Sequence, residues 1–190
     1  MVKSKQDPTT KIVKITDFGM SKEMYKPKAG WLKPGDYGGT QVYMAPEIFR
    51  DRLYSEFKDV LGKDIGFDAF KADIYALGVV LYEMLCVCTP FDKFTRSQLM
   101  YQAQMARNWT FPTNTTLTTD VKLLVEAMIE PDPAHRLDPY GIWMHPWIQK
   151  SYVRNQGWKS IQKKGDGSTP PGNEKQKSRL MDSIIKVFKR

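Results

Sequence analysis

The segment 73–87 has the strongest hydrophobic pattern in the chain. Its apolar positions are Ile74, Leu77, Val79, Val80, Leu81, Tyr82, Met84 and Leu85. They recur at helical spacing and occupy most sides of the predicted helix, which is typical of a helix buried in a core. We expect the pair Thr89-Pro90 to end it.

Weaker helical patterns follow this segment. They predict helices at 95–106, 119–129 and 138–150. Asp138 is the expected N-cap of the last helix, because its carboxylate can accept from backbone N–H groups. Pro139 stands in the first turn, where a missing N–H costs nothing. The carboxyl-terminal part of this region is therefore predicted to be helical throughout.

The amino-terminal third has a different pattern. β-branched residues at 11–16 predict one short strand. The glycines, prolines and charges of 20–38 predict a loop, and 50–71 is predicted to be irregular. The expected fold is therefore mainly α, with a short N-terminal strand.

Composition and charge narrow the classes of function. The chain has 190 residues, 41% of them hydrophobic, which is enough for one globular domain. The sequence contains no run of 18 apolar residues, so we expect no transmembrane segment. Residues 150–190 hold eleven Lys and Arg against three Asp and Glu, so they account for the whole net charge of +8. The neutral remainder offers no electrostatic reason to expect a nucleic acid partner.

The two cysteines, Cys86 and Cys88, stand one residue apart in an apolar run. We interpret them as a pair of buried helix thiols rather than as metal ligands or a disulfide, because zinc sites usually need four ligands. This usage fits a reducing compartment, and we expect an intracellular protein of the cytoplasm, the nucleus or both.

Two short motifs stand in order near the amino terminus. The first is Asp17-Phe18-Gly19, and the second is the run Gly39-Thr40-Gln41-Val42-Tyr43-Met44-Ala45-Pro46-Glu47. Together they resemble the two ends of the activation segment of a protein kinase. The resemblance extends over about residues 10–149, because Thr89-Pro90-Phe91, Pro131-Asp132-Pro133-Ala134-His135-Arg136-Leu137 and His145-Pro146-Trp147-Ile148 also match serine/threonine kinases.

The resemblance implies roles for individual residues. Asp17 would bind the Mg²⁺ that accompanies ATP, Phe18 would pack inward, and Gly19 would let the backbone turn. Thr40 would bond to the catalytic Asp and the adjacent Lys of a serine/threonine kinase. Protein Ser and Thr side chains are then the expected substrates.

Three further positions match structural residues of the family. Glu47 is expected to pair with Arg136, and Asp73 matches the helix-start Asp that braces the catalytic loop. Asp36 stands where many members carry a phosphorylatable Thr. Its carboxylate either imitates the phosphate or is an ordinary loop residue, and the sequence leaves both readings open.

Two hallmarks of the kinase family are missing from the printed sequence. It contains no G-x-G-x-x-G run and no His-Arg-Asp triplet. We therefore expect a kinase-like C-terminal lobe without the N-terminal lobe and the catalytic loop, with Met1 possible as an internal methionine of a longer protein. The expected domains are a partial kinase domain at 1–150, a flexible basic linker at 151–177 and a basic amphipathic tail at 178–190.

The function predicted from this resemblance is a Ser/Thr protein kinase of the calmodulin-kinase-like group, of checkpoint or testis-specific type, that uses ATP and Mg²⁺. We do not expect this chain by itself to phosphorylate a substrate. The alternative is a non-catalytic kinase-like module that docks partners. The tail at 178–190 is either a target for calmodulin, an autoinhibitory helix or a membrane contact, or it is a helix covering the lobe or a disordered end.

Overall fold

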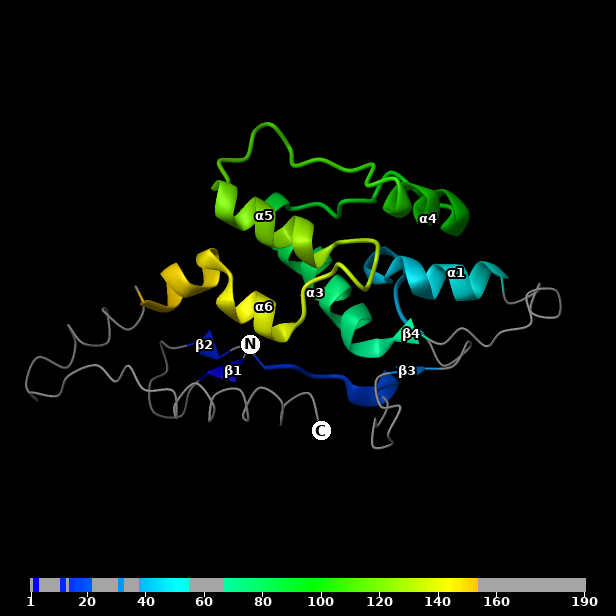
Figure 1. Ribbon diagram of the computed structural model, residues 1–190, viewed down its shortest axis with the longest axis horizontal. Coiled ribbons are helices and arrows are strands. Elements are labelled where there is room, and N and C mark those ends of the chain that lie inside the picture. Colours follow the sequence, from blue (N-terminus) through cyan, green and yellow to red (C-terminus); the bar gives the residue numbers. More distant parts are fainter. Residues whose placement is uncertain are drawn as a thin grey trace, which may run out of the picture.

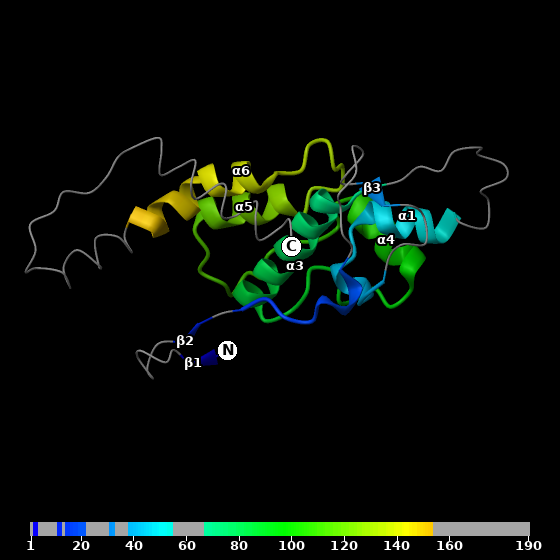
Figure 2. The same ribbon diagram turned by 90° about the horizontal axis from the view of Figure 1, so that it is seen from below.

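The computed structural model describes residues 2–3, 11–12, 14–21, 31–32, 38–54 and 67–153. Its centre is the long helix α3, Ala69–Cys86. Helix α5, Thr119–Met128, packs along α3. At the other end of the molecule, α1, Pro46–Tyr54, packs against α4, Ser97–Met105 (Figures 1 and 2). The expected mainly helical fold is confirmed.

Four short strands form two small antiparallel sheets among the described residues. Strands β1, Val2–Lys3, and β2, Lys11–Ile12, pair with Val2 opposite Ile12. Strands β3, Trp31–Leu32, and β4, Phe67–Asp68, pair with Trp31 opposite Asp68. The predicted strand at 11–16 is therefore too long, because residues 14–17 lie in irregular backbone that leads to the 3₁₀ helix η1, Phe18–Met20.

Helix α3 begins earlier than its hydrophobic pattern predicts. Asp68 caps it, since its carboxylate accepts from the backbone N–H groups of Phe70 at 2.9 Å and Lys71 at 3.2 Å. The helix ends at Cys86 rather than at Thr89-Pro90, because Val87 adopts the left-handed conformation, with φ of 61°, and its N–H bonds to the Glu83 carbonyl at 2.8 Å. A β-branched residue is uncommon in that conformation.

The core lies where α3 meets α1, α4 and α5. Its fully covered side chains include Phe49, Tyr75, Val79, Phe91 and Val125. A second cluster joins α3 to α5 and to the last helices, through Ile74, Leu124 and Met128. At the crossing of α3 and α5 the backbones come so close that a Cβ on Gly78 would lie 2.8 Å from the Met128 Cβ. Glycine is required there by space rather than by backbone conformation.

Three other sequence expectations are corrected by the structure. The region 50–71 is not irregular throughout, because α1 extends to Tyr54 and β4 precedes α3; residues 55–66 lie outside the described part. The predicted helix 138–150 is two helices, which are α6, Pro139–Met144, and a helix over residues 146–153, and His145 lies between them in an extended conformation. Pro146 explains the break, because its ring fits the first turn of a new helix.

The cysteines are half-buried free thiols. Cys86 is the last residue of α3 and Cys88 follows the helix, so the expectation of a buried helix pair is only partly met. Within the described residues no three His, Cys, Asp or Glu side chains gather as metal ligands. None of the described helices is both long and apolar enough to cross a bilayer.

Candidate functional site

Asp17 lies at a sharp turn of the backbone. Its φ and ψ are 64° and 70°, the left-handed conformation that Asp adopts more readily than most residues. Ser21 closes the turn, because its N–H and its hydroxyl both donate to the Phe18 carbonyl, at 3.0 and 2.6 Å. The Asp17 side chain is exposed. A single exposed carboxylate suits one ligand of Mg²⁺, an ion that proteins hold with one or two carboxylates together with nucleotide phosphates.

Of the two residues after Asp17, Phe18 is not placed as expected. Gly19 lies within the turn, in η1, but without a positive φ, and the left-handed residue is Asp17. A Cβ on Gly19 would meet only an oxygen of Asp17, at an ordinary 3.5 Å. Phe18 does not pack inward, since 62% of it is exposed and no described segment covers its ring.

The run from Gly38 to Tyr43 lies against the end of α3. Gly39 has φ of 115°, a conformation that glycine alone adopts without strain. Thr40 is exposed and starts the 3₁₀ helix η2, Gln41–Tyr43, without a capping bond from its side chain. The Tyr43 hydroxyl donates to the Glu83 carboxylate of α3 at 2.9 Å, which raises the pKa of Tyr43 through that hydrogen bond, with burial and the negative charge adding to it.

The start of α1 is buried in the lobe. Met44, Ala45, Pro46 and Glu47 are all covered. The Met44 carbonyl accepts from the side-chain amide of Gln104 on α4, at 2.9 Å. This bond satisfies a backbone group that no helix partner reaches, and it ties the segment to α4.

Glu47 and Arg136 form a buried ion pair. The two terminal nitrogens of Arg136 donate to the two carboxylate oxygens of Glu47, at 2.7 and 2.9 Å. The side chains are only 5% and 0% exposed. Two parallel bonds of this kind are stronger and more directional than one.

The remaining donors of Arg136 also have acceptors. Its Nε donates to the Glu130 carbonyl at 2.8 Å, and the terminal nitrogens donate to the carbonyls of Lys71 at 2.7 Å and Pro131 at 3.1 Å. All five N–H groups of the guanidinium are therefore used. The Lys71 ammonium returns a hydrogen bond to the Arg136 carbonyl, and the guanidinium lies 5.0 Å from the centre of the Tyr75 ring.

Asp73 lies in the second turn of α3 and not at its start. Part of Asp73 is exposed to solvent, yet the surrounding protein removes enough water from its carboxyl to raise the pKa of Asp73. No hydrogen bond or ion pair within the described ranges joins Asp17, Thr40 and Asp73 to one another. Asp36 lies outside the described residues. The structure thus brings together Glu47 and Arg136 from the predicted set, and leaves the other described members exposed.

Sequence reasoning missed Lys71, Gln104 and the Tyr43–Glu83 bond. The carbonyl of Lys71 carries no sequence signal, because any residue type supplies one. Gln104 had a weak signal, since it interrupts the apolar stripe of its helix with a polar side chain that must find a partner when buried.

The sequence was compared with known families and proteins. Residues 1–148 match the protein kinase domain family. The chain is 33% identical to an Aurora kinase of Eremothecium gossypii over 139 residues. These aligned residues make up 73% of this chain and 32% of that protein. It is 31% identical to testis-specific serine/threonine-protein kinase 3 of Homo sapiens over 136 residues. These residues make up 72% of this chain and 44% of that protein.

A third relative is serine/threonine-protein kinase ULK3 of Rattus norvegicus, 28% identical over 141 residues that cover 74% of this chain and 26% of that protein. The chain therefore spans less than half the length of these relatives. Protein kinases in general use ATP with Mg²⁺. From the match over residues 1–148 and from these relatives, the chain belongs to the protein kinase domain family.

Proposed function

We propose that this chain supplies the activation segment and the substrate-side helices of a Ser/Thr protein kinase, which transfers the γ-phosphoryl group of ATP to protein Ser and Thr side chains. The observation that carries the proposal is the Glu47–Arg136 pair. It holds the start of α1 in the lobe, so that Thr40 and the residues beside it are presented at the surface.

In this proposal Asp17 holds Mg²⁺, which neutralises charge on the nucleotide phosphates. Its exposed carboxylate on a left-handed turn supports that role. Thr40 would orient the groups that accept the substrate hydroxyl, and its side chain is free of any capping bond. Asp36 keeps both of its readings, as a substitute for a phosphate or as a plain loop residue.

The second candidate is a non-catalytic kinase-like lobe that docks partner proteins. The buried Glu47–Arg136 pair supports it equally, because the pair fixes the lobe without taking part in phosphoryl transfer. The two candidates differ in one property, which is transfer of phosphate that depends on Asp17.

The test uses the native gene product, tagged at its own locus and purified together with an Asp17→Asn version. Each is incubated with Mg²⁺ and γ-labelled ATP, with myelin basic protein as the acceptor, and the labelled amino acids are identified. Label on Ser and Thr that disappears with Asp17→Asn supports the kinase. Asp92→Asn, which neutralises an exposed carboxylate elsewhere, serves as the matched control and should leave the label unchanged.

Equal label from wild type and Asp17→Asn, or no label from either, would contradict the kinase and favour the docking module. The 190-residue chain is assayed in parallel, and we expect it to transfer nothing by itself. Labelled substrate from that chain, lost in Asp17→Asn, would refute this narrower expectation while supporting the kinase.

The remaining parts of the proposal concern place and partners. Free thiols at Cys86 and Cys88 support a reducing compartment, in the cytoplasm or nucleus. Calmodulin stays a predicted partner of 178–190, which lies outside the described residues. Calcium-dependent retention of the full chain on calmodulin resin would support it, and retention that ignores calcium would count against it.

A further inference from the structure

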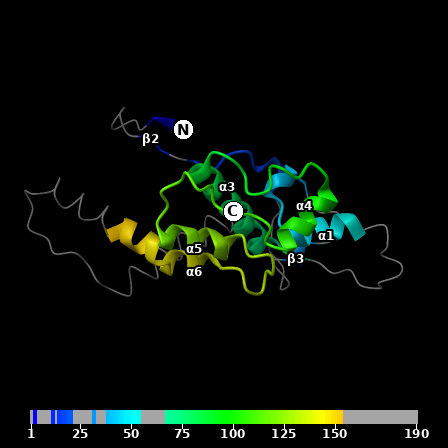
Figure 3. The ribbon, with the colours of Figure 1, turned by 90° about the horizontal axis from the view of Figure 1, so that it is seen from above.

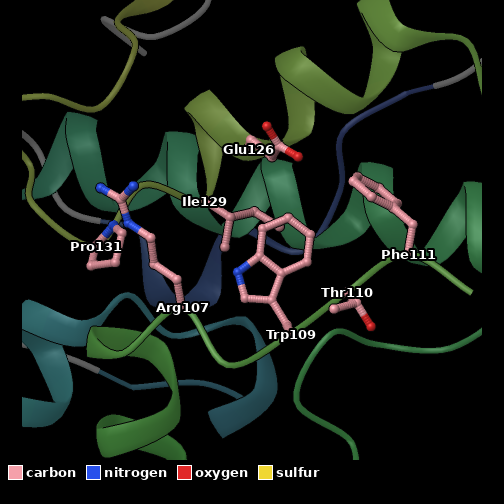
Figure 4. A pocket seen from close by; sticks show the side chains of 7 residues that line it. All are labelled: Arg107, Trp109, Thr110, Phe111, Glu126, Ile129 and Pro131. Atoms are coloured by element: carbon pink, nitrogen blue, oxygen red, sulfur yellow. The ribbon is translucent and has the colours of Figure 1, made fainter.

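A cavity of about 350 Å³ lies between α5 and the loop that follows α4 (Figure 4). Its walls are apolar, from Trp109, Phe111, Ile129 and Pro131, and two charged side chains, Arg107 and Glu126, flank them. Its size and lining are those of a site for a small ligand or for one inserted side chain. In Figure 1 α5 and this loop lie above α3 and residues 14–20 lie below it, and in Figure 3 α5 and residues 14–20 lie on either side of α3.

The loop that carries Trp109 is held by its own backbone. Arg107 has φ of 51°, an uncommon conformation for a residue with a side chain. Three hydrogen bonds fix it: Arg107 N–H to the Gln104 carbonyl, Asn108 N–H to Ala103 and Trp109 N–H to Arg107, at 3.0, 2.8 and 2.9 Å. Such a conformation persists only where the surroundings determine it, so Trp109 is presented in a fixed place.

The aromatic wall is equally constrained. Trp109 meets Tyr82 and Phe111 edge to face, with ring centres 5.7 and 5.4 Å apart, and Tyr82 stacks on Phe111 at 5.5 Å. The Tyr82 hydroxyl donates to the Thr110 carbonyl at 2.8 Å. Burial raises the pKa of Tyr82 well above its ordinary value, so the hydroxyl remains a donor. The cavity therefore has a rigid face before any ligand binds.

Of the two charged residues that flank the cavity, Arg107 has an ion-pair partner and Glu126 has none among the described residues. Arg107 is already paired with Glu130, at 2.5 Å. Glu126 is exposed, and among the described residues it has no ion-pair partner. Lys122 stands one turn before it on α5 but lies over the Phe111 ring, 5.6 Å from the centre; a Lys that precedes a Glu by four residues is the weaker order for a pair. The cavity thus has one carboxylate without a counter-ion.

We propose that this cavity binds an arginine side chain of a partner protein. The planar guanidinium would stack on Trp109 while the carboxylate of Glu126, which lies above the indole ring in Figure 4, accepts its N–H groups. Lysine fits less well, because its ammonium is compact, more strongly hydrated and unable to stack. The position of Lys122 over Phe111 illustrates that this wall already receives a cation. The inference uses no residue of the proposed phosphoryl-transfer site and does not depend on that proposal.

The test measures peptide binding to the full chain labelled with ¹⁵N. The probe is a short Gly/Ser peptide with one central arginine, and the reference is the same peptide with citrulline, which has the same shape but no charge. The indole N–H signal of Trp109 is assigned with Trp109→Phe. We expect the arginine peptide to shift this signal in a saturable way, and the citrulline peptide to bind roughly tenfold more weakly.

Variants separate the proposed contacts from general attraction. Glu126→Gln should weaken the arginine peptide roughly tenfold, because it removes the counter-ion and keeps the shape. Asp92→Asn removes an equal charge at an exposed site elsewhere and should change nothing. Glu126 is exposed, so its variant is expected to fold, and circular dichroism checks this. Equal binding of the two peptides, an unchanged affinity in Glu126→Gln, or an unmoved Trp109 signal would each overturn the proposal.

Discussion

Arg136 and Glu47 are joined by two parallel hydrogen bonds although 89 residues separate them in the chain. Arg136 also takes acceptors from Lys71, Glu130 and Pro131, so one side chain connects the start of α1, the first turn of α3 and the segment after α5. A buried guanidinium with every donor satisfied is tolerated, whereas one that has lost its carboxylate is not.

The first prediction concerns this pair. Glu47→Gln leaves the buried guanidinium without a counter-ion, and we expect it to lower the free energy of unfolding by about 3–5 kcal/mol. Urea unfolding followed by circular dichroism measures the loss. The double variant Glu47→Leu with Arg136→Met removes both charges and should lose less than Glu47→Gln alone. A Glu47→Gln variant with an unchanged midpoint would contradict a structural role for the pair.

A second prediction reverses the usual effect of glycine in a helix. Replacing a helix-interior glycine by alanine normally stabilises by roughly 1 kcal/mol. At Gly78 the new methyl would meet the Met128 Cβ at 2.8 Å and an Ile129 carbon at 3.0 Å. We therefore expect Gly78→Ala to destabilise, by roughly 1–3 kcal/mol after repacking. Met128→Ala should not rescue it, because that variant keeps the clashing Cβ. A raised urea midpoint for Gly78→Ala would show that α5 moves away freely.

The cap of α3 gives a third prediction. Asp68→Ala removes the acceptor of two backbone N–H groups, and we expect a loss of about 0.5–2 kcal/mol. Asp68→Asn keeps an oxygen acceptor and should recover most of the loss. Chemical unfolding of the three proteins compares them. Equal losses in both variants would mean that the charge, rather than the hydrogen bonds, matters at this end.

The pKa values of two aspartates, Asp132 and Asp73, are shifted in opposite directions from the ordinary aspartate value. The Ala134 N–H at 2.9 Å, and then the His135 ring, lower the pKa of Asp132. Its contribution to stability is therefore present above the ordinary aspartate value of about 3.9 and is lost as the pH falls through the folded value. Removal of water raises the pKa of Asp73 instead.

Carboxyl ¹³C shifts followed over an acid titration measure both groups, and Asp132→Asn and Asp73→Asn assign the signals. Asp132 should titrate below about 3.9 and Asp73 above it. Ala134→Pro is a matched test of the cause, because proline has no N–H to donate; it should move the pKa of Asp132 upward. The reverse order of the two aspartates would refute the assignment of causes.

The parts of the fold that could be predicted are those where side-chain pattern and structure coincide. The helix around 73–86 and α5 follow from apolar periodicity, and Asp138 caps α6 as expected, accepting from Gly141 N–H at 2.7 Å. Helix α1 was missed because its residues have no regular apolar stripe, and its helical state depends on the packing of Phe49 and Glu47 in the lobe. The break at His145 was missed because a helical pattern continues across Pro146.

In the candidate site, too, side-chain patterns predict some features and leave out those that depend on tertiary contacts. Glu47 and Arg136 could be paired only through the family resemblance, since spacing along the chain carries no information about a contact over 89 residues. The carbonyl acceptors around Arg136 have no signature in side chains at all. The cavity at Trp109 had one faint signal, an alternation of aromatic residues at Trp109 and Phe111 in a segment otherwise read as a connection between helices.

The separation of Glu47 from Arg136 also sets an order of events during synthesis. At about 5–20 residues per second, Arg136 is added roughly 4–18 s after Glu47. Until then the Glu47 carboxylate lacks the guanidinium that binds it in the folded lobe. The residues on either side of Thr40 are consequently made well before the contact that fixes the start of α1, and during that interval they are open to chaperones that bind the nascent chain.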